Sequence, residues 1–89
     1  MGEGGAKMKD DDGIDVMHGD VISFSFGLPP REGRCKVYLY NSVFFAFDVD
    51  RPDIWMKLRN LRRHVGRWYI ELNDSEYERR TKRKHGTHR

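Results

Sequence analysis

At 89 residues, the chain is long enough for one small domain but offers little room for a deep substrate pocket. Charged residues make up 35% of the sequence and aromatic residues 12%, and this aromatic content argues against a chain that is disordered throughout. Residues 1–56 carry six Lys/Arg against ten Asp/Glu, a net charge of −4, whereas residues 57–89 carry eleven against four, a net charge of +7. A basic half favours polyanionic partners, because each neutralised phosphate releases counterions.

The cysteine content and the hydropathy pattern bear on location. Cys35 is the single cysteine, so it has no partner for an internal disulfide, and this favours a reducing, cytoplasmic compartment. The polar, Gly-rich start does not resemble a signal peptide, and the longest apolar stretch, residues 43–47, is too short to cross a bilayer. We therefore expect no membrane partner.

In the N-terminal half of the chain, the residue pattern predicts a leader and two strands. Residues 1–17 are rich in glycine and contain an acidic run at positions 10–12, so they are predicted to form a flexible leader. Alternation of apolar and polar residues predicts strands over residues 20–26 and 34–40. Two prolines between two glycines, within residues 27–33, separate these strands.

The pairing of the next strand, residues 44–49, is open at the sequence level. A two-residue loop at Asn41 and Ser42 would place Tyr40 opposite Val43. A three-residue loop would place Tyr40 opposite Phe44 and would also bring an opposite-charge pair together. We favour the three-residue loop, which groups four apolar side chains on the other face of the sheet. These four are Val37, Leu39, Phe45 and Phe47.

A helix is predicted to begin at Pro52 or Asp53, since proline and aspartate both suit the first turn. Apolar residues recur beyond this point with helical spacing and predict one buried stripe. The stripe consists of Ile54, Leu58, Leu61 and Val65. Gly66 ends the helix, and residues 67–72 alternate as a further strand.

The element order β-β-β-α-β predicts an α+β domain over residues 18–73. We expect a small curved antiparallel sheet with one amphipathic helix packed on it, and closure toward a barrel stays open as an alternative. Residues 74–89 are predicted to form a basic tail, in which residues 73–75 could cap a short helix.

The basic half supplies the candidate nucleic-acid-binding residues. Five of the six residues 79–84 are basic, and such runs bind phosphates without sequence preference. The predicted set comprises Arg59, Arg62, Arg63, Arg67, Arg79, Arg80, Lys82, Arg83 and Lys84.

Aromatic residues supply candidates for stacking or for an interface. Helical spacing would place Trp55 beside Arg59 and Arg62, where a base could stack while phosphates are held. The outer face of the sheet is expected to present a second group of side chains, namely Lys36, Tyr38, Tyr40, Phe44 and Tyr69. Such a face can bind single-stranded nucleic acid or a protein, or it can simply pack across strands.

Catalytic and metal-binding patterns are weak. His85 and His88 lack a third ligand, and His18 and Asp20 lack a nearby nucleophile. Cys35 is expected on the core face as a small apolar residue. We therefore expect no enzyme activity, no cofactor and no metal.

The composition and patterns favour a small non-enzymatic binding protein that acts on nucleic acid or on a ribonucleoprotein or other protein complex. The alternative is a protein-binding inhibitor that uses the aromatic face or the acidic segments at residues 10–12 and 48–53. Small compact proteins of phage or mobile-element type, which inhibit host-defence or transcription complexes, share this general build by analogy.

Overall fold

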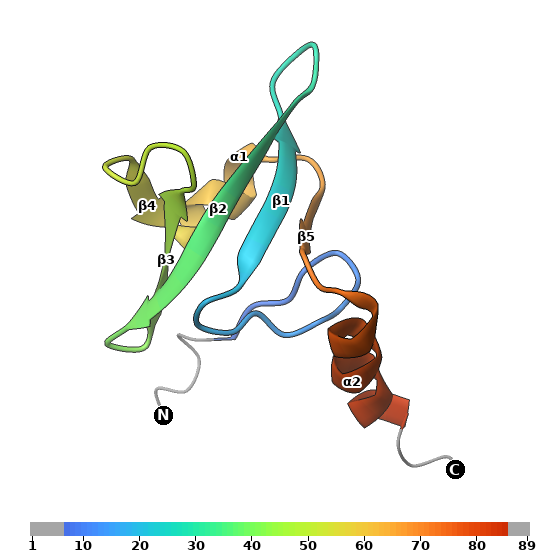
Figure 1. The fold of residues 1–89 in the computed structure, drawn as a ribbon. Helices are drawn as coiled ribbons and strands as arrows, with labels where there is room; N and C mark the ends of the chain where they lie inside the picture. Colours follow the sequence, from blue (N-terminus) through green and yellow to red (C-terminus); the bar gives the residue numbers. More distant parts are fainter. Residues whose placement is uncertain (1–6, 86–89) are drawn as a thin grey trace.

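One open antiparallel sheet of five strands organises the structure, with the strand order β4-β3-β2-β1-β5 (Figure 1). The computed structural model describes the backbone of residues 7–85 and the side chains of residues 7–81. The strands are β1 (Val21–Phe26), β2 (Arg31–Tyr40), β3 (Val43–Asp48), β4 (Trp55–Lys57) and β5 (Trp68–Ile70), and the helices are α1 (Leu58–His64) and α2 (Asp74–His85). The predicted α+β fold is confirmed. The sheet does not close into a barrel, because β4 and β5 lie at its opposite edges.

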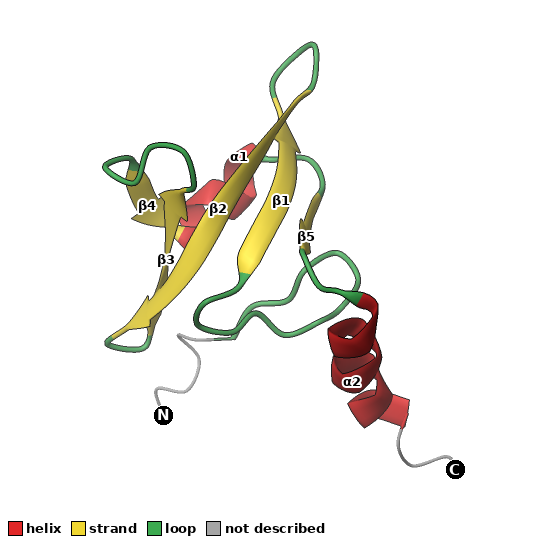
Figure 2. Cartoon of the chain, in the orientation of Figure 1, coloured by secondary structure: helices red, strands yellow, loops and turns green. Residues whose placement is uncertain are grey.

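Helix α1 covers one face of the sheet, behind β2 in the view of Figure 2, whereas α2 lies beyond the end of β5. The core forms between α1, this face of the sheet and the N-terminal loop. It consists of Ile14, Val16, Ile22, Cys35, Val37, Phe44, Ala46, Leu58, Trp68 and Ile70.

The prediction that the helix begins at Pro52 or Asp53 is wrong. Residues 55–57 form strand β4 instead, and α1 begins only at Leu58. Trp55 stands opposite Phe47 on β3, so pairing with a sheet edge outweighs the local preference for a helix. Three of the four stripe residues are confirmed, because Leu58 is fully buried and Leu61 and Val65 pack against the core, whereas Ile54 is exposed.

The preferred pairing of β2 with β3 is also wrong, and the two-residue alternative is the one that forms. Tyr40 stands opposite Val43, and both turn residues have positive φ, 52° at Asn41 and 64° at Ser42. These angles are typical of a type I′ turn, whose twist matches that of the paired strands. A turn of this kind fixes the register of the whole hairpin.

The register reverses the faces that we expected for β3. Phe44 and Ala46 point into the core, where they are 4% and 3% exposed, so the prediction of an exposed Phe44 is wrong. Phe45 and Phe47 turn to the outer face, and their predicted grouping with Val37 in the core is wrong as well. The sheet thus gains two aromatic rings on the face that α1 does not cover.

The N-terminal segment is part of the folded core from residue 8 onward, and residues 1–6 lie outside the described part. Ile14 and Val16 are buried, and Lys9 pairs with Asp15 in an isolated bridge. The expectation of a flexible leader is therefore wrong for residues 8–16. Because two apolar side chains alternate there, the segment can contribute to a core in spite of its acidic composition.

Acidic side chains of the N-terminal loop, residues 8–16, form hydrogen bonds with the edge strand β5. The buried Asp10 carboxylate accepts hydrogen bonds from the backbone N–H groups of Asp12, Ile14 and Ile70 at 3.0, 2.8 and 3.0 Å. The neighbouring Asp11 carboxylate accepts one from the N–H of Trp68 at 3.1 Å. Both carboxylates satisfy backbone donors that the edge of β5 would otherwise leave without a partner.

The C-terminal helix α2 confirms the predicted short helix within the basic tail. The Asn73 side chain accepts a hydrogen bond from the backbone N–H of Glu76 at 2.8 Å, which caps the helix start. Arg80 donates to the Asp20 carboxylate at 2.9 and 3.2 Å, and the two side chains are only 14% and 12% exposed. This ion pair fastens α2 to the loop that precedes β1.

Candidate functional site

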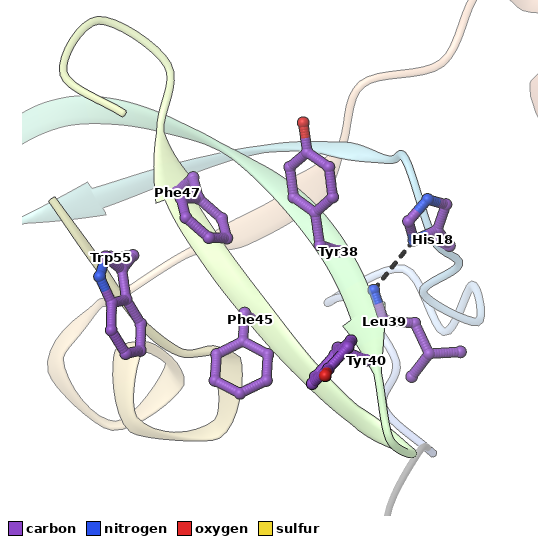
Figure 3. A pocket seen from close by; sticks show the side chains of 7 residues that line it. All are labelled: His18, Tyr38, Leu39, Tyr40, Phe45, Phe47 and Trp55. Carbon is purple, nitrogen blue, oxygen red and sulfur yellow. Dashed lines mark hydrogen bonds between the residues drawn. The ribbon is translucent and has the colours of Figure 1, made fainter. Parts of the chain in front are cut away.

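The outer face of the sheet, opposite α1, carries a group of aromatic side chains that we call the aromatic face (Figure 3). Its members come from alternate positions of β2, β3 and β4, because Tyr38 stands opposite Phe45 and Phe47 stands opposite Trp55. The aromatic face consists of Tyr38, Tyr40, Phe45, Phe47 and Trp55. Together with His18 and Leu39, these residues line a groove of about 430 Å³.

The rings of the aromatic face support one another. The ring centroids of Tyr38 and Phe47 lie 5.1 Å apart at an interplanar angle of 79°, and those of Phe45 and Trp55 lie 5.7 Å apart at 62°. Phe47 and Trp55 stack at 6.2 Å. Even so, Trp55 is 56% exposed and Tyr40 is 67% exposed. The surface is therefore ordered before any ligand arrives, which lowers the entropic cost of binding.

His18 closes one end of the groove. Its Nδ1 accepts a hydrogen bond from the backbone N–H of Leu39 at 2.9 Å, and its ring meets Tyr38 edge-on at 5.5 Å. Because Nδ1 is the acceptor, the neutral ring carries its proton on Nε2. His18 thus adds a hydrogen-bond donor to a surface that is otherwise almost entirely apolar.

Positive charge accompanies the aromatic face. The Lys36 Nζ lies 6.0 Å from the centroid of the Tyr38 ring, and Lys57 stands opposite Phe45 in the register of β3 and β4. None of the seven residues that line the groove is acidic. A second groove of about 550 Å³ adjoins the first and shares Tyr38 and Phe47 with it.

The β1 and β5 side of the same sheet face is polar. The Arg34 guanidinium makes two hydrogen bonds with the Glu71 carboxylate, at 2.7 and 2.9 Å, and Ser23 donates a third. The hydrogen bonds from Arg34 are the main cause that lowers the pKa of Glu71, and Glu71 in turn raises the pKa of Arg34. Tyr69 stands opposite Ser23, so this polar group separates it from the aromatic face. The predicted platform of Tyr38, Tyr40 and Tyr69 is therefore divided.

The arginines of α1 lie on the other side of the sheet. Leu58 enters the core from α1, whereas Trp55 belongs to the aromatic face, so the expected grouping of Trp55 with these arginines does not form. Arg62 pairs with Asp11 at 3.3 Å and lies 5.1 Å from the centroid of the Trp68 ring. Arg59 and Arg63 are exposed, and neither makes an ion pair with another described side chain.

The remaining predicted basic residues have different surroundings. Arg67 lies 6.0 Å from the centroid of the Tyr69 ring, Arg79 is exposed near Glu76, and Arg80 is held by Asp20. The side chains of Lys82, Arg83 and Lys84 lie outside the described part. Arg62 and Arg80 thus already have carboxylate partners, whereas Arg59 and Arg63 are free to meet a ligand.

Sequence reasoning missed His18, Phe45 and Phe47 as members of the site. For the two phenylalanines the signal was present, because Asn41 and Ser42 suit a two-residue turn. For His18 no local pattern signals the role, since its ring is placed by Leu39, 21 residues away along the chain.

Two observations on the described residues bear on metal binding and on thiol reactivity. No group of three or more His, Cys, Asp or Glu side chains there could hold a metal ion. Burial raises the pKa of Cys35 to about 12, so this thiol carries almost no thiolate at neutral pH.

Neither helix in the described part is long and apolar enough to cross a membrane.

Comparisons with known proteins give no relatives: no protein-family model, no curated protein and no solved structure matches the chain. Any functional conclusion therefore depends on the site itself.

Proposed function

We propose that the chain is a non-enzymatic binding protein that binds single-stranded nucleic acid on the aromatic face. The observation that carries this proposal is the set of five aromatic side chains on one exposed sheet face, with Lys36 and Lys57 in register beside them. Bases stack on exposed aromatic rings whatever their sequence, because every base has a π-face. In this proposal the ammonium groups of Lys36 and Lys57 bind the backbone phosphates of such a strand.

The basic half would act at longer range. With a net charge of +7 over residues 57–89, it attracts a polyanion before contact and raises the association rate. Arg59 and Arg63 lie on the opposite side of the sheet, so we assign them to attraction or to a second phosphate contact. In this proposal the basic side chains that the structure describes do not act as one surface.

The test is a titration of labelled single-stranded DNA and RNA at several salt concentrations. Trp55→Ala should weaken binding by about 1–3 kcal/mol, the usual contribution of one stacked base. Tyr77→Ala is the matched control, because Tyr77 is an exposed aromatic on α2, away from the aromatic face. Equal losses in the two variants would contradict stacking on the aromatic face.

Salt dependence tests the two lysines separately. Each phosphate contact to a single strand contributes a slope of about −0.7 in log affinity against log salt. Replacing both Lys36 and Lys57 with glutamate should therefore flatten the slope by at least about 1.4, or twice 0.7. The variant Arg59→Glu/Arg63→Glu should leave the effect of Trp55→Ala unchanged if the two surfaces act independently.

A protein-binding regulator is the second candidate, and the almost purely apolar groove favours it. Leu39, Phe45 and Phe47 offer carbon atoms rather than polar partners, which suits the apolar centre of a protein interface. The absence of any nucleic-acid binding at low salt would overturn our first proposal and leave this one. A cytoplasmic location accompanies both proposals, since Cys35 is a single buried thiol.

A further inference from the structure

The two edges of the sheet differ in cover and in charge. At β5, the N-terminal loop is hydrogen-bonded to the edge through Asp10 and Asp11, and Glu71 follows the strand directly. At β4, the other edge, all three residues of the strand are exposed. Residues 54–70, which contain β4 and α1, carry five Lys/Arg and no Asp/Glu. A polyanion on the aromatic face therefore has one open, basic edge to cross.

Lys57 marks the point where the aromatic face meets this open edge. It stands opposite Phe45 of the aromatic face, and α1 begins at the next residue, on the other side of the sheet (Figure 2). The acidic loop at residues 48–53 joins the opposite end of β4, so Lys57 is the member of this strand farthest from it. Arg59 follows two residues later, at most about 7 Å along the chain. Lys57 and Arg59 therefore connect the two faces of the sheet.

Arg59 and Arg63 extend this basic path along α1. They are four residues apart, which is about 6 Å along a helix, and both are exposed. Neither makes an ion pair with another described side chain, and α1 contains no acidic residue. Like charges at this spacing repel each other. Phosphates bound between the two guanidinium groups would replace this repulsion with attraction.

We propose that a single strand of nucleic acid bound on the aromatic face crosses the β4 edge at Lys57 and continues onto α1, where Arg59 and Arg63 bind further phosphates. This inference rests on the proposed function, because stacking on the aromatic face anchors the strand. Once the strand is anchored, the contacts on α1 form within one complex, at high effective concentration. The ligand is therefore a strand long enough to reach both faces of the sheet, rather than a mononucleotide.

The geometry indicates how long this strand must be. Strands β2, β3 and β4 lie about 4.8 Å apart, so the aromatic face is about 10 Å wide. The path from Lys57 over Arg59 to Arg63 adds roughly 13 Å. Within the usual range of site sizes, a strand of about four nucleotides covers the aromatic face alone, and one of about twelve reaches both faces.

The test compares oligothymidylates of these two lengths in titrations that follow the fluorescence of Trp55 at several salt concentrations. Stacking of a base on Trp55 should quench its emission with either length. The variant Arg59→Glu/Arg63→Glu should weaken binding of the longer strand by at least about tenfold more than binding of the shorter one. Its salt slope should flatten by about 1.4, or twice 0.7, with the longer strand only. The wild-type chain should bind one copy of the longer strand.

The matched control is Arg31→Glu/Arg79→Glu, which changes the net charge by the same amount. Arg31 lies at the hairpin end of β2 and Arg79 lies on α2, and both are exposed. This control should weaken binding of both lengths alike, because it alters only the long-range attraction. If Arg59→Glu/Arg63→Glu loses its circular dichroism signal, Arg59→Gln/Arg63→Gln replaces it in every titration.

Equal losses with both lengths, or a loss no larger than that of the control, would overturn the crossing of the β4 edge. Quenching of Trp55 by the shorter strand would in that case leave the proposed function standing. Two copies of the longer strand on each chain would also overturn the crossing, because the two faces then bind separate molecules. If neither length quenched Trp55 even at low salt, both the crossing and the proposed function would be wrong.

Discussion

The two tryptophans mark two regions of the sheet that are built in opposite ways. Trp68 on β5 is fully buried, and its indole N–H donates to the carbonyl oxygen of Lys9 at 3.2 Å. Trp55 on β4 is 56% exposed, and its ring packs against Phe45 and Phe47 of the aromatic face. One edge strand is covered by the N-terminal loop, whereas the other supports a surface that nothing in the described chain covers.

The two regions differ in what covers them, because the N-terminal loop is hydrogen-bonded to β5 through two carboxylates and no such loop lies over β4 in the described chain. At β5, the carboxylates of Asp10 and Asp11 meet backbone donors, and each hydrogen bond has one geometry. At β4, Trp55 packs against other rings of the aromatic face and leaves carbon atoms exposed. The first region stabilises the fold, and the second is available for binding.

The largest expected effect separates the two tryptophans directly. Trp68→Ala should lower the free energy of unfolding by about 3–5 kcal/mol, as truncation of a buried tryptophan does. Trp55→Ala should lower it by a smaller amount, about 1–3 kcal/mol, because it removes two aromatic pairs of about 0.5–1.5 kcal/mol each. Urea unfolding of both variants gives the measurement. Equal losses would show that the aromatic face belongs to the core.

The acidic loop should show the next largest contrast. Asp10→Ala removes the acceptor of three backbone N–H groups and should cost about 2–4 kcal/mol, because these donors stay buried without partners. Asp12→Ala is the matched control two residues away, at an exposed side chain, and should change stability by less than about 0.5 kcal/mol. A mild effect of Asp10→Ala in urea unfolding would contradict the fastening of the loop to β5.

The C-terminal helix offers a smaller contrast. Arg80→Ala breaks the mostly buried pair with Asp20 and should cost about 1–3 kcal/mol, with partial loss of the helical circular dichroism signal. Arg79→Ala removes an exposed side chain that is 4.0 Å from Glu76 and should cost less than about 0.5 kcal/mol. If the two variants melted alike, α2 would not be fastened through Arg80.

The smallest effect concerns the polar group between the two regions. The pKa of Glu71 is lower in the folded chain than in the unfolded chain, where it is about 4.3. The ionised Glu71 carboxylate therefore stabilises the fold at pH values above about 4.3, and this stabilisation is lost as the pH falls through the folded pKa. Glu71→Gln should therefore be slightly less stable than wild type at pH 7, and the difference should vanish at acidic pH. Urea unfolding at both pH values measures this. A difference that grew on acidification would have the wrong sign.

Local patterns in the sequence were enough to predict four of the five strands and the burial of Leu58. Alternation of apolar residues indicates β1, β2, β3 and β5 because each has one buried face. Strand β4 could not be predicted, because its three residues gain their structure from pairing with β3 rather than from their own pattern.

The candidate site was predictable only in part, because its members depend on whether the β2–β3 turn contains two residues or three. Tyr38, Tyr40 and Trp55 were identified as exposed aromatics, but Phe45 and Phe47 join them only in the register of the two-residue turn. Their cross-strand pairs differ in energy by amounts too small to decide between registers, whereas the positive φ angles of the turn decide it. The buried Asp10 escaped prediction because its partner Ile70 is 60 residues away.

That separation also has a consequence for the order of events during synthesis. Translation produces residue 10 long before residue 70, so the hydrogen bond from the Ile70 N–H to the Asp10 carboxylate cannot form while β1, β2 and β3 emerge and pair locally. Strands β1, β2 and β3 can therefore pair early, whereas the N-terminal loop can bind to β5 only after β5 has been synthesised. A nascent chain stalled before Trp68 should present its N-terminal segment to proteases, and one that extends past Ile70 should protect it.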